Sequence, residues 1–178
     1  MMARWTFLAV LALSGRVLAA GFDYSIVGNG CMVDNPSIRN DLYENRGHGV
    51  GFKPGKFGTI RLTCPITIDR HQASCWGCSV GSSNRKWHSY TLFYKDSDGA
   101  ATGTFINVQL RHANFSAPAI GTTWMNTTVA LPATGPTSFT VDMPDVDPGL
   151  TSFWWFEVRL TRKMSSTADV EFLGITLQ

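Results

Sequence analysis

The sequence predicts an all-β protein, an antiparallel β-sandwich of the jelly-roll-like kind with about seven or eight strands. Two observations favour this fold. From residue 57 onward, apolar and polar residues alternate with a period of two in several short runs. Clusters of Gly, Pro and Asp separate these runs, and no segment after residue 21 has a convincing helical period. Such alternation gives each strand one apolar face for the core and one polar face.

The expected elements follow in order along the chain. Residues 21–57 are rich in glycine and are expected to be irregular, with a short strand at 22–27, a turn at 34–37 and a loop or edge segment at 46–52. Pro65, Pro132 and Gly135-Pro136 are expected to end strands, and 144–149 to form a turn. The remaining strands are expected at 60–64, 87–94, 104–112, 122–131, 138–143, 152–161 and 170–177.

The strand at 152–161 carries the most informative alternation. Its first face is apolar throughout and is expected to lie in the core: Trp154, Phe156, Val158 and Leu160. Its second face places an aromatic pair beside two charges and supplies the candidate ligand-binding residues: Phe153, Trp155, Glu157 and Arg159. Loops could cover this aromatic pair, or the pair could form an exposed platform of the kind that sugar-binding modules use.

Several segments resemble small exported bacterial β-proteins. They are the Thr59–Pro65 strand with its Cys64-Pro65 end, the earlier lone Cys31, and the closing strands at 153–160 and 171–177. The resemblance covers most of the chain after residue 20. That group has no firmly assigned activity, so the resemblance implies fold and export alone. Cys75 and Cys78 depart from the pattern of the group.

The N-terminus has the pattern of a cleaved secretory signal peptide. Arg4 precedes the apolar run 5–13, and small residues at 17–20 predict cleavage after Ala19 or Ala20. The nine-residue run is far shorter than the roughly 20 residues of a spanning helix. We therefore expect a secreted or periplasmic protein with no membrane span, and a single domain at 21–178.

Charge argues against nucleic acid as a partner. The chain has 15 Lys and Arg against 13 Asp and Glu, and removal of Arg4 and Arg16 with residues 1–20 leaves 13 of each sign. A formally neutral protein has no broad field to steer it onto nucleic acid or an anionic membrane.

The mature chain keeps four cysteines, and an even count in an exported protein favours disulfides. We favour Cys31 with Cys64 and Cys75 with Cys78, although four cysteines allow three pairings. The Cys75-Trp-Gly-Cys78 motif could instead hold a metal or act in redox chemistry, but no βαβ pattern surrounds it and Ser79 follows it. We expect structural disulfides, with no metal and no cofactor.

The carboxylates could form two further kinds of site, a glycosidase pair or a calcium site. Glu157 and Glu171 lie in strands and could approach each other on one sheet face as a glycosidase pair. Asp96 and Asp98 precede Gly99 in a turn and could hold Ca²⁺, while Asp145 and Asp147 share another turn. None of the four histidines forms a metal-binding motif. No catalytic residue is assigned.

These patterns favour an exported, non-catalytic binding module with carbohydrate as the ligand, although a protein surface could take its place. One alternative is a structural subunit of an extracellular or envelope assembly, formed by self-association through edge strands. The other is a small hydrolase of the cell wall or of polysaccharide.

Overall fold

The computed structural model describes residues 24–66, 87–99, 101, 103–114, 120–122, 127–129, 133–146 and 152–178. In this part of the chain strands dominate and every strand pair is antiparallel, which confirms the predicted class. The elements are β1 (Tyr24–Val27), η1 (Gly28–Gly30), β2 (Met32–Val33), α1 (Asn35–Arg39), β3 (Tyr43–Arg46), β4 (Gly49–Phe52), β5 (Gly58–Ile66), β6 (Trp87–Asp96), β7 (Thr104–Asn114), β8 (Ile120–Thr122), β9 (Thr127–Val129), β10 (Ala133–Val146), β11 (Ser152–Arg162) and β12 (Val170–Leu177).

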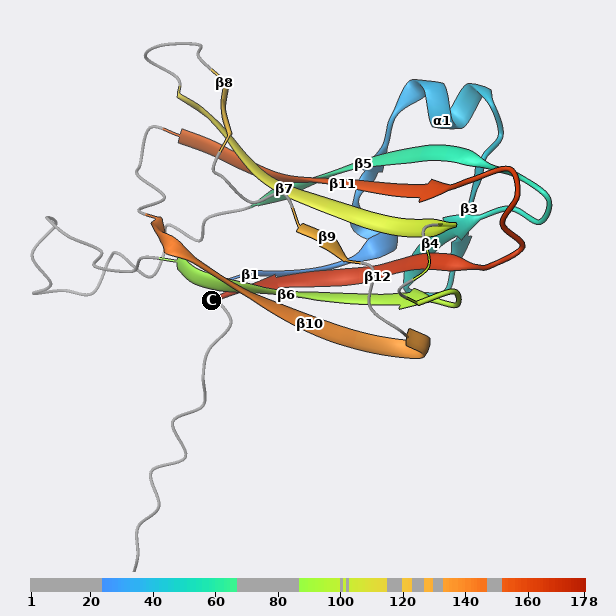
Figure 1. The fold of residues 1–178 in the computed structure, drawn as a ribbon. Coiled ribbons are helices and arrows are strands. Elements are labelled where there is room, and N and C mark those ends of the chain that lie inside the picture. The colour runs from blue at the N-terminus through green and yellow to red at the C-terminus, as the bar shows by residue number, and fades with distance from the viewer. Residues whose placement is uncertain are drawn as a thin grey trace, which may run out of the picture.

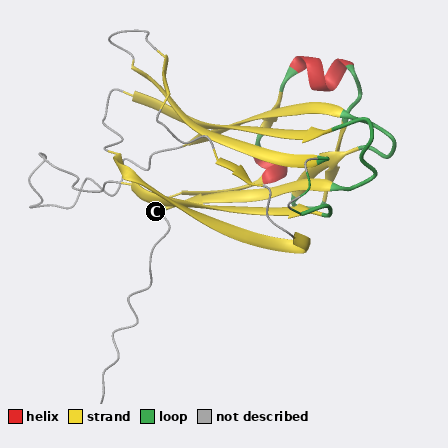
Figure 2. Cartoon of the chain, in the orientation of Figure 1, coloured by secondary structure: helices red, strands yellow, loops and turns green. Residues whose placement is uncertain are grey.

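Two six-stranded sheets form the two layers of the sandwich (Figure 1). Sheet A has the order β10-β6-β12-β4-β3, and β1 also pairs with β12. Sheet B has the order β2-β5-β11-β7-β8, and β9 also pairs with β7. The long strands β5, β6 and β7 alternate between the sheets, as do β10, β11 and β12, which gives the jelly-roll-like path. Figure 2 shows the strands in both layers and the helical turns, which belong to the N-terminal connections.

The inner faces of the two sheets share one hydrophobic core. Every second residue of β11 from Trp154 to Leu160 is at most 4% exposed. The residues that face them from β5 and β7 are at most 1% exposed: Ile60, Leu62, Cys64, Ile106, Val108 and Leu110. Tyr90 of β6 meets Phe156 of β11 across the core, with ring centroids 5.5 Å apart. The period-two pattern therefore predicts the core faces of these strands correctly.

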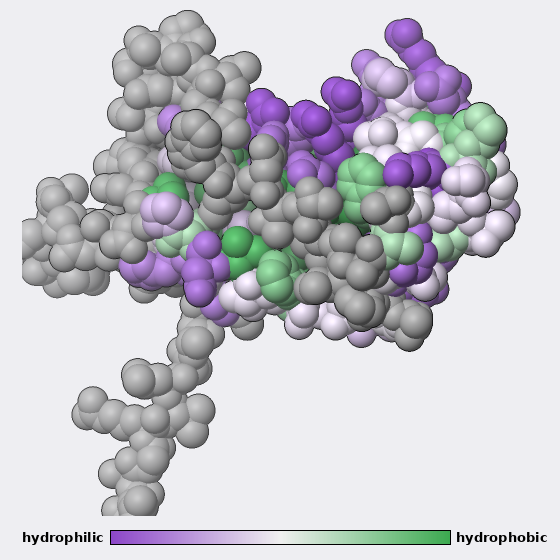
Figure 3. Space-filling view, in the orientation of Figure 1, coloured by the Kyte–Doolittle hydropathy of each residue, from purple (hydrophilic) through white to green (hydrophobic). Residues whose placement is uncertain are grey.

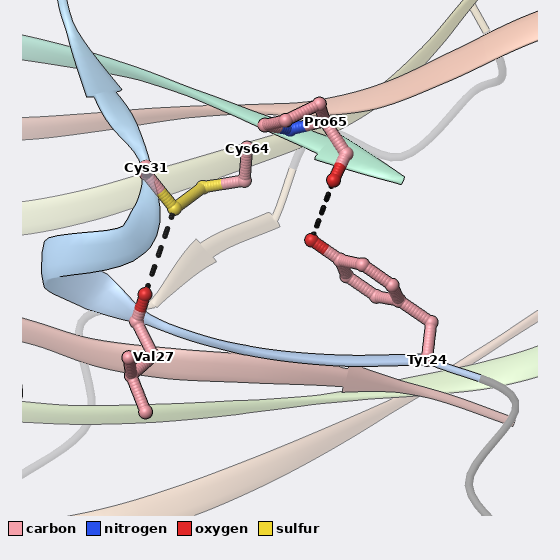
Figure 4. Close-up of a disulfide and its surroundings, with 5 residues drawn as sticks. All are labelled: Tyr24, Val27, Cys31, Cys64 and Pro65. Atoms are coloured by element: carbon pink, nitrogen blue, oxygen red, sulfur yellow. Dashed lines mark hydrogen bonds between the residues drawn. A yellow bond between two sulfur atoms is a disulfide. The ribbon is translucent and has the colours of Figure 1, made fainter. Parts of the chain in front are cut away.

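A disulfide fixes the place where the chain crosses from sheet A to sheet B (Figure 4). Cys31 lies between β1 and β2 and is bonded to Cys64 of β5, with their Cα atoms 4.4 Å apart. Nearby, the Tyr24 hydroxyl of β1 donates a hydrogen bond to the Pro65 carbonyl at 2.7 Å. Burial raises the pKa of Tyr24 to about 12. The bridge is the pairing that the sequence favours, whereas Cys75 and Cys78 lie outside the described residues.

The N-terminal segment is more regular than the expected irregular stretch at 21–57. Its described part contains the strands β1 to β4 and two short helical turns. Each of these elements has at most five residues, which is too few for a hydrophobic period to be recognised in the sequence. Asp34 caps α1 by accepting a hydrogen bond from the Ser37 backbone N–H at 3.0 Å, and Pro36 lies in the first turn, where a missing N–H costs little. The expected loop or edge segment at 46–52 is largely the β3–β4 hairpin, turned at Gly47 with φ 62°.

The expectation of one strand at 122–131 is wrong. The described residues there form β8 and β9, which both pair with β7 in registers that differ by two residues. Thr122 lies opposite Arg111, and Thr128 lies opposite Asn107. A six-residue step along one side thus faces a four-residue step along β7, so one regular strand cannot make both pairings.

The strand expected at 138–143 is much longer, because β10 runs from Ala133 to Val146. Pro136, which we expected to end a strand, and Pro144, which we expected in a turn, both lie within it. Both prolines fall where the register against β6 shifts. β10 is the edge strand of sheet A, so a proline there interrupts hydrogen bonding on one side only.

Membrane insertion through a helix has no support in the described part of the chain. No helix there is long and apolar enough to cross a bilayer.

The Cys31–Cys64 bridge should contribute substantially to stability. Its cysteines are 33 residues apart, and a loop of that length corresponds to about 3–4 kcal/mol in the loop-closure model. We therefore expect the Cys31→Ala/Cys64→Ala variant to lose about that much free energy of unfolding in urea titrations. The matched control, Cys75→Ala/Cys78→Ala, should lose less because the loop is far shorter. Equal or reversed losses would show that the bridge does not act by closing this loop.

Candidate functional site

The candidate site is built on β11, the central strand of sheet B. β11 pairs without a register shift with β5 on one side, from Trp154 to Arg162, and with β7 on the other, from Ser152 to Arg162. Because no bulge interrupts either ladder, alternate residues keep to one face along the whole strand. The even-numbered residues from Trp154 to Leu160 are buried, so the odd-numbered side chains lie on the outer face of sheet B. All four candidate residues, Phe153, Trp155, Glu157 and Arg159, share this face.

An aromatic pair occupies one end of the face. Phe153 is 45% exposed and Trp155 is partly buried. Their ring centroids are 5.8 Å apart and their planes are tilted by 33°. Pro65 of β5 and Arg111 of β7 are the register partners of Trp155. The two rings therefore present a partly open apolar surface with an aliphatic ring on one side and a cation on the other.

Trp154, one residue along, has the opposite environment. It is 4% exposed, stacks on His112 with ring centroids 4.6 Å apart, and meets the edge of Trp87 at 5.3 Å. The predicted division between a core tryptophan and an outer tryptophan matches these positions.

A charged network continues the face beside the aromatic pair. The Glu157 carboxylate accepts a hydrogen bond from Arg159 Nε at 2.6 Å and forms an ion pair with Arg111 Nε of β7, also at 2.6 Å. Arg111 Nη2 donates in turn to the Gln109 side-chain oxygen at 2.8 Å. Glu157 is only 18% exposed, so these contacts fix its carboxylate and the two guanidinium groups before any ligand arrives.

The flanking strands add polar residues that the sequence analysis did not assign to the site. Arg61 and Asn107 lie on either side of Arg159, and Thr63 and Gln109 lie on either side of Glu157. Each occupies a polar position of the period-two pattern in its own strand. This position predicts that the side chain lies on an outer face, and it is the only indication of these residues that the sequence contains. The registers that bring β5, β7 and β11 together join residues far apart in sequence, and the alternation does not reveal them.

Helix α1 adjoins one edge of this face. The Ser37 hydroxyl donates to the Thr59 carbonyl at 3.4 Å and accepts a hydrogen bond from the Arg61 backbone N–H at 3.3 Å, which holds α1 against β5. In Figure 3, hydrophilic side chains gather along the margin of the molecule that corresponds to sheet B in Figure 1. The outer face of sheet B is thus a polar surface with an aromatic end.

Glu157 and Glu171, which could have approached each other on one sheet face, lie in different sheets. Glu157 lies on the outer face of sheet B, whereas Glu171 belongs to β12 of sheet A and lies opposite Gly51 and Lys95. Burial raises the pKa of Glu171, and the nearby Arg46 opposes this shift. The two carboxylates are on different layers of the sandwich and cannot act on one glycosidic bond. Alternation assigns a residue to a face of its strand but does not say to which sheet the strand belongs.

Asp96 and Asp98 do lie close together, at the end of β6. The Thr104 hydroxyl is 2.5 Å from an oxygen of each carboxylate, and the Thr104 backbone N–H donates to Asp98 at 2.9 Å. Asp96 is fully buried, and its Oδ2 has no hydrogen-bond partner among the described residues. Burial, reinforced by the neighbouring Asp98, raises the pKa of Asp96 to about 7.

Metal-binding clusters are not evident in the described ranges. No group of three or more His, Cys, Asp or Glu side chains there could hold a metal ion. Asp147, Cys75 and Cys78 lie outside those ranges.

The raised pKa of Asp96 makes stability depend on pH. Its carboxyl keeps its proton in the folded state up to about pH 7, whereas its ordinary value is 3.8. The folded state therefore binds more protons between these values, and the free energy of unfolding should fall as pH rises through this window and level off above it. We expect Asp96→Asn to flatten this fall in denaturant titrations from about pH 4 to pH 8.

A matched control for this experiment is Asp142→Asn, which alters an exposed carboxylate on β10. This variant should keep the wild-type slope. EDTA is added to remove metal ions. If the free energy of unfolding of the wild-type protein rose between pH 4 and pH 7 under these conditions, Asp96 would not keep its proton in the folded state.

The two tryptophans should differ in their contribution to stability. Trp154→Ala opens a core cavity and should cost about 3–5 kcal/mol of the free energy of unfolding, a typical loss for such a truncation. Trp155→Ala removes a partly exposed ring and should cost much less. A pair of melting curves checks this, and equal destabilisation would place Trp155 in the core.

Comparison with known proteins gives no family for this chain: no family model matches the sequence, and no curated protein matches it. Among solved structures, the carbohydrate-binding module TmCBM61 in complex with β-1,4-galactotriose aligns with 88% of this chain and 89% of its own, at a TM-score of 0.40 and 10% identity. A structure described as "CBM4 structure and function" aligns with 88% of this chain and 96% of its own, at a TM-score of 0.41 and 14% identity.

Proposed function

We propose that this chain is an exported, non-catalytic module that binds carbohydrate on the outer face of sheet B. The observation that carries the proposal is the partly exposed Phe153–Trp155 pair, which lies beside a fixed network of Glu157, Arg159 and Arg111.

The two parts of the face suit the two sides of a sugar. A sugar ring has an apolar face of C–H groups, which packs against an aromatic ring, and hydroxyl groups around its edge. The Glu157 carboxylate accepts hydrogen bonds from hydroxyls, and the guanidinium groups of Arg159 and Arg111 donate to them. Apolar packing from the rings and directional bonds from the network can therefore act on one ligand.

The shape of the surface favours a polymer over a small molecule. The site lies along one strand, and the step from Phe153 to Arg159 spans roughly 20 Å at the usual rise of a strand. Phe153 at one end of this row is 45% exposed and the Arg159 side chain at the other end is 35% exposed, so both ends are accessible to a chain of sugars that lies along β11. A module of this kind holds its ligand and needs no catalytic carboxylate pair.

Export is the second part of the proposal. The Cys31–Cys64 disulfide is typical of an oxidising compartment, and the predicted signal at 1–20 would direct the chain there. N-terminal sequencing of the secreted or periplasmic protein should then begin at Ala20 or Gly21. A protein that retains residues 1–19 would contradict cleavage.

Carbohydrate binding should depend on Trp155. We expect the mature protein to bind sugars on a glycan array, and Trp155→Ala to abolish that binding with little change in melting temperature, because the ring lies on the outer face. Phe93→Ala is the matched control, since Phe93 is an aromatic residue 36% exposed on β6 of sheet A. This control should bind as the wild type does.

Three outcomes would contradict the proposal: no response on the array, equal loss of binding in Phe93→Ala, or wild-type binding by Trp155→Ala. Size-exclusion chromatography of the mature protein completes the test. Large assemblies together with a silent array would instead favour a structural subunit.

A further inference from the structure

The outer face of sheet B has an arrangement of charge that specifies its ligand further. We propose that the carbohydrate bound there is a uronate-containing polysaccharide, whose carboxylates bind between Arg61 and Arg159. This inference rests on the proposed function and names the chemical class of its ligand.

The key feature is a pair of like charges on adjacent strands. Arg61 of β5 and Arg159 of β11 are register partners on the outer face. Residues directly opposite on antiparallel strands have Cβ atoms about 5 Å apart, and two like charges at such positions destabilise the pairing. Arg159 is compensated by Glu157. Arg61 is exposed, and within the described part of the chain its guanidinium has no hydrogen bond or ion pair.

The acids nearest to these arginines are already engaged. Glu157 is shared between Arg159 and Arg111, and no ion pair joins it to Arg61. Asp34 follows β2, and its backbone N–H donates to the Arg61 carbonyl at 3.0 Å. Its carboxylate, however, accepts the Ser37 N–H and caps α1, with no ion pair to Arg61. Among the described residues, three guanidinium groups, of Arg61, Arg111 and Arg159, therefore face two carboxylates that already have partners, those of Glu157 and Asp34.

The opposite face of the sandwich has the reverse balance. There Arg46 forms ion pairs with Glu44 and Asp169, and Lys95 approaches the same Asp169 at 3.4 Å, with Glu171 nearby. Three carboxylates thus meet two cations on sheet A. The mature chain is expected to be neutral overall, so this separation gives the outer face of sheet B the positive share.

A uronate meets the requirements of this face. Its carboxylate is planar and accepts two parallel N–H bonds from a guanidinium, which a sugar hydroxyl cannot do. Arg159 lies four residues from Trp155 on the same face, roughly 13 Å along the strand. One sugar ring of a polymer can therefore pack on Trp155 while the carboxylate of a later unit lies between Arg61 and Arg159.

The test compares two polymers with the same sugar backbone, one with free carboxylates and the other with methyl esters in their place. Binding of the mature protein to polygalacturonate and to methyl-esterified polygalacturonate is measured by isothermal titration calorimetry. We expect the acid form to bind at least about tenfold more tightly, since hydrogen bonds to charged groups are the stronger ones. That preference should shrink as sodium chloride is raised, because salt screens exposed charges.

Two variants locate the effect. Arg61→Gln should bring the two affinities together, because it weakens binding of the acid form far more than binding of the ester form. Lys95→Gln removes the same unit charge from the opposite face and should keep the full preference. Dextran sulfate serves as a third ligand, because it carries dense charge but no carboxylates.

The outcomes separate this inference from the proposed function. Equal affinities for acid and ester, or a preference that survives Arg61→Gln, would overturn the uronate assignment while carbohydrate binding stands. A preference lost in Lys95→Gln would also overturn it, because diffuse charge would then suffice. If dextran sulfate bound and polygalacturonate did not, the site would be assigned to sulfate esters instead. Failure of every polymer and of the glycan array would remove the proposed function itself.

Discussion

The unbroken pairing of β11 with β5 and β7 is the constraint on which the rest of the site depends. Side chains alternate strictly along a strand, so a slip of one residue would exchange the two faces. It would bring Trp155 and Glu157 into the core and expose Trp154 and Phe156. The buried residues of β11 therefore fix the register, and through it they fix which side chains reach the outer surface. In this protein the core determines the site.

The outer network shows how such a surface can be rigid without being buried. Glu157 connects side chains of β11 and β7, and Arg111 extends the contact to Gln109. Surface ion pairs of this kind add little stability, because water screens them and their side chains lose freedom. Their effect is on geometry: they hold donors and acceptors in place on a stiff sheet, so a ligand need not order them on binding.

Much of this architecture could be predicted from the sequence, and the failures have physical causes. Local alternation separates Trp154 from Trp155, and the even cysteine count in an exported chain favours disulfides without choosing among their three pairings. Register between distant strands is not encoded locally, so the meeting of Arg61 with Arg159 could not be foreseen. Sheet membership is equally hidden, which is why the sequence left a pairing of Glu157 with Glu171 open. Strands of two to four residues show no period at all.

The edges of the two sheets bear on how the protein behaves at high concentration. Long, flat, unpaired edges recruit strands from other molecules and start aggregation. In the described part of the chain, β10 is the one long edge, and it is interrupted by Pro136 and Pro144, while β2, β3, β8 and β9 have at most four residues each. Edge-to-edge growth into fibrils thus lacks a continuous template here.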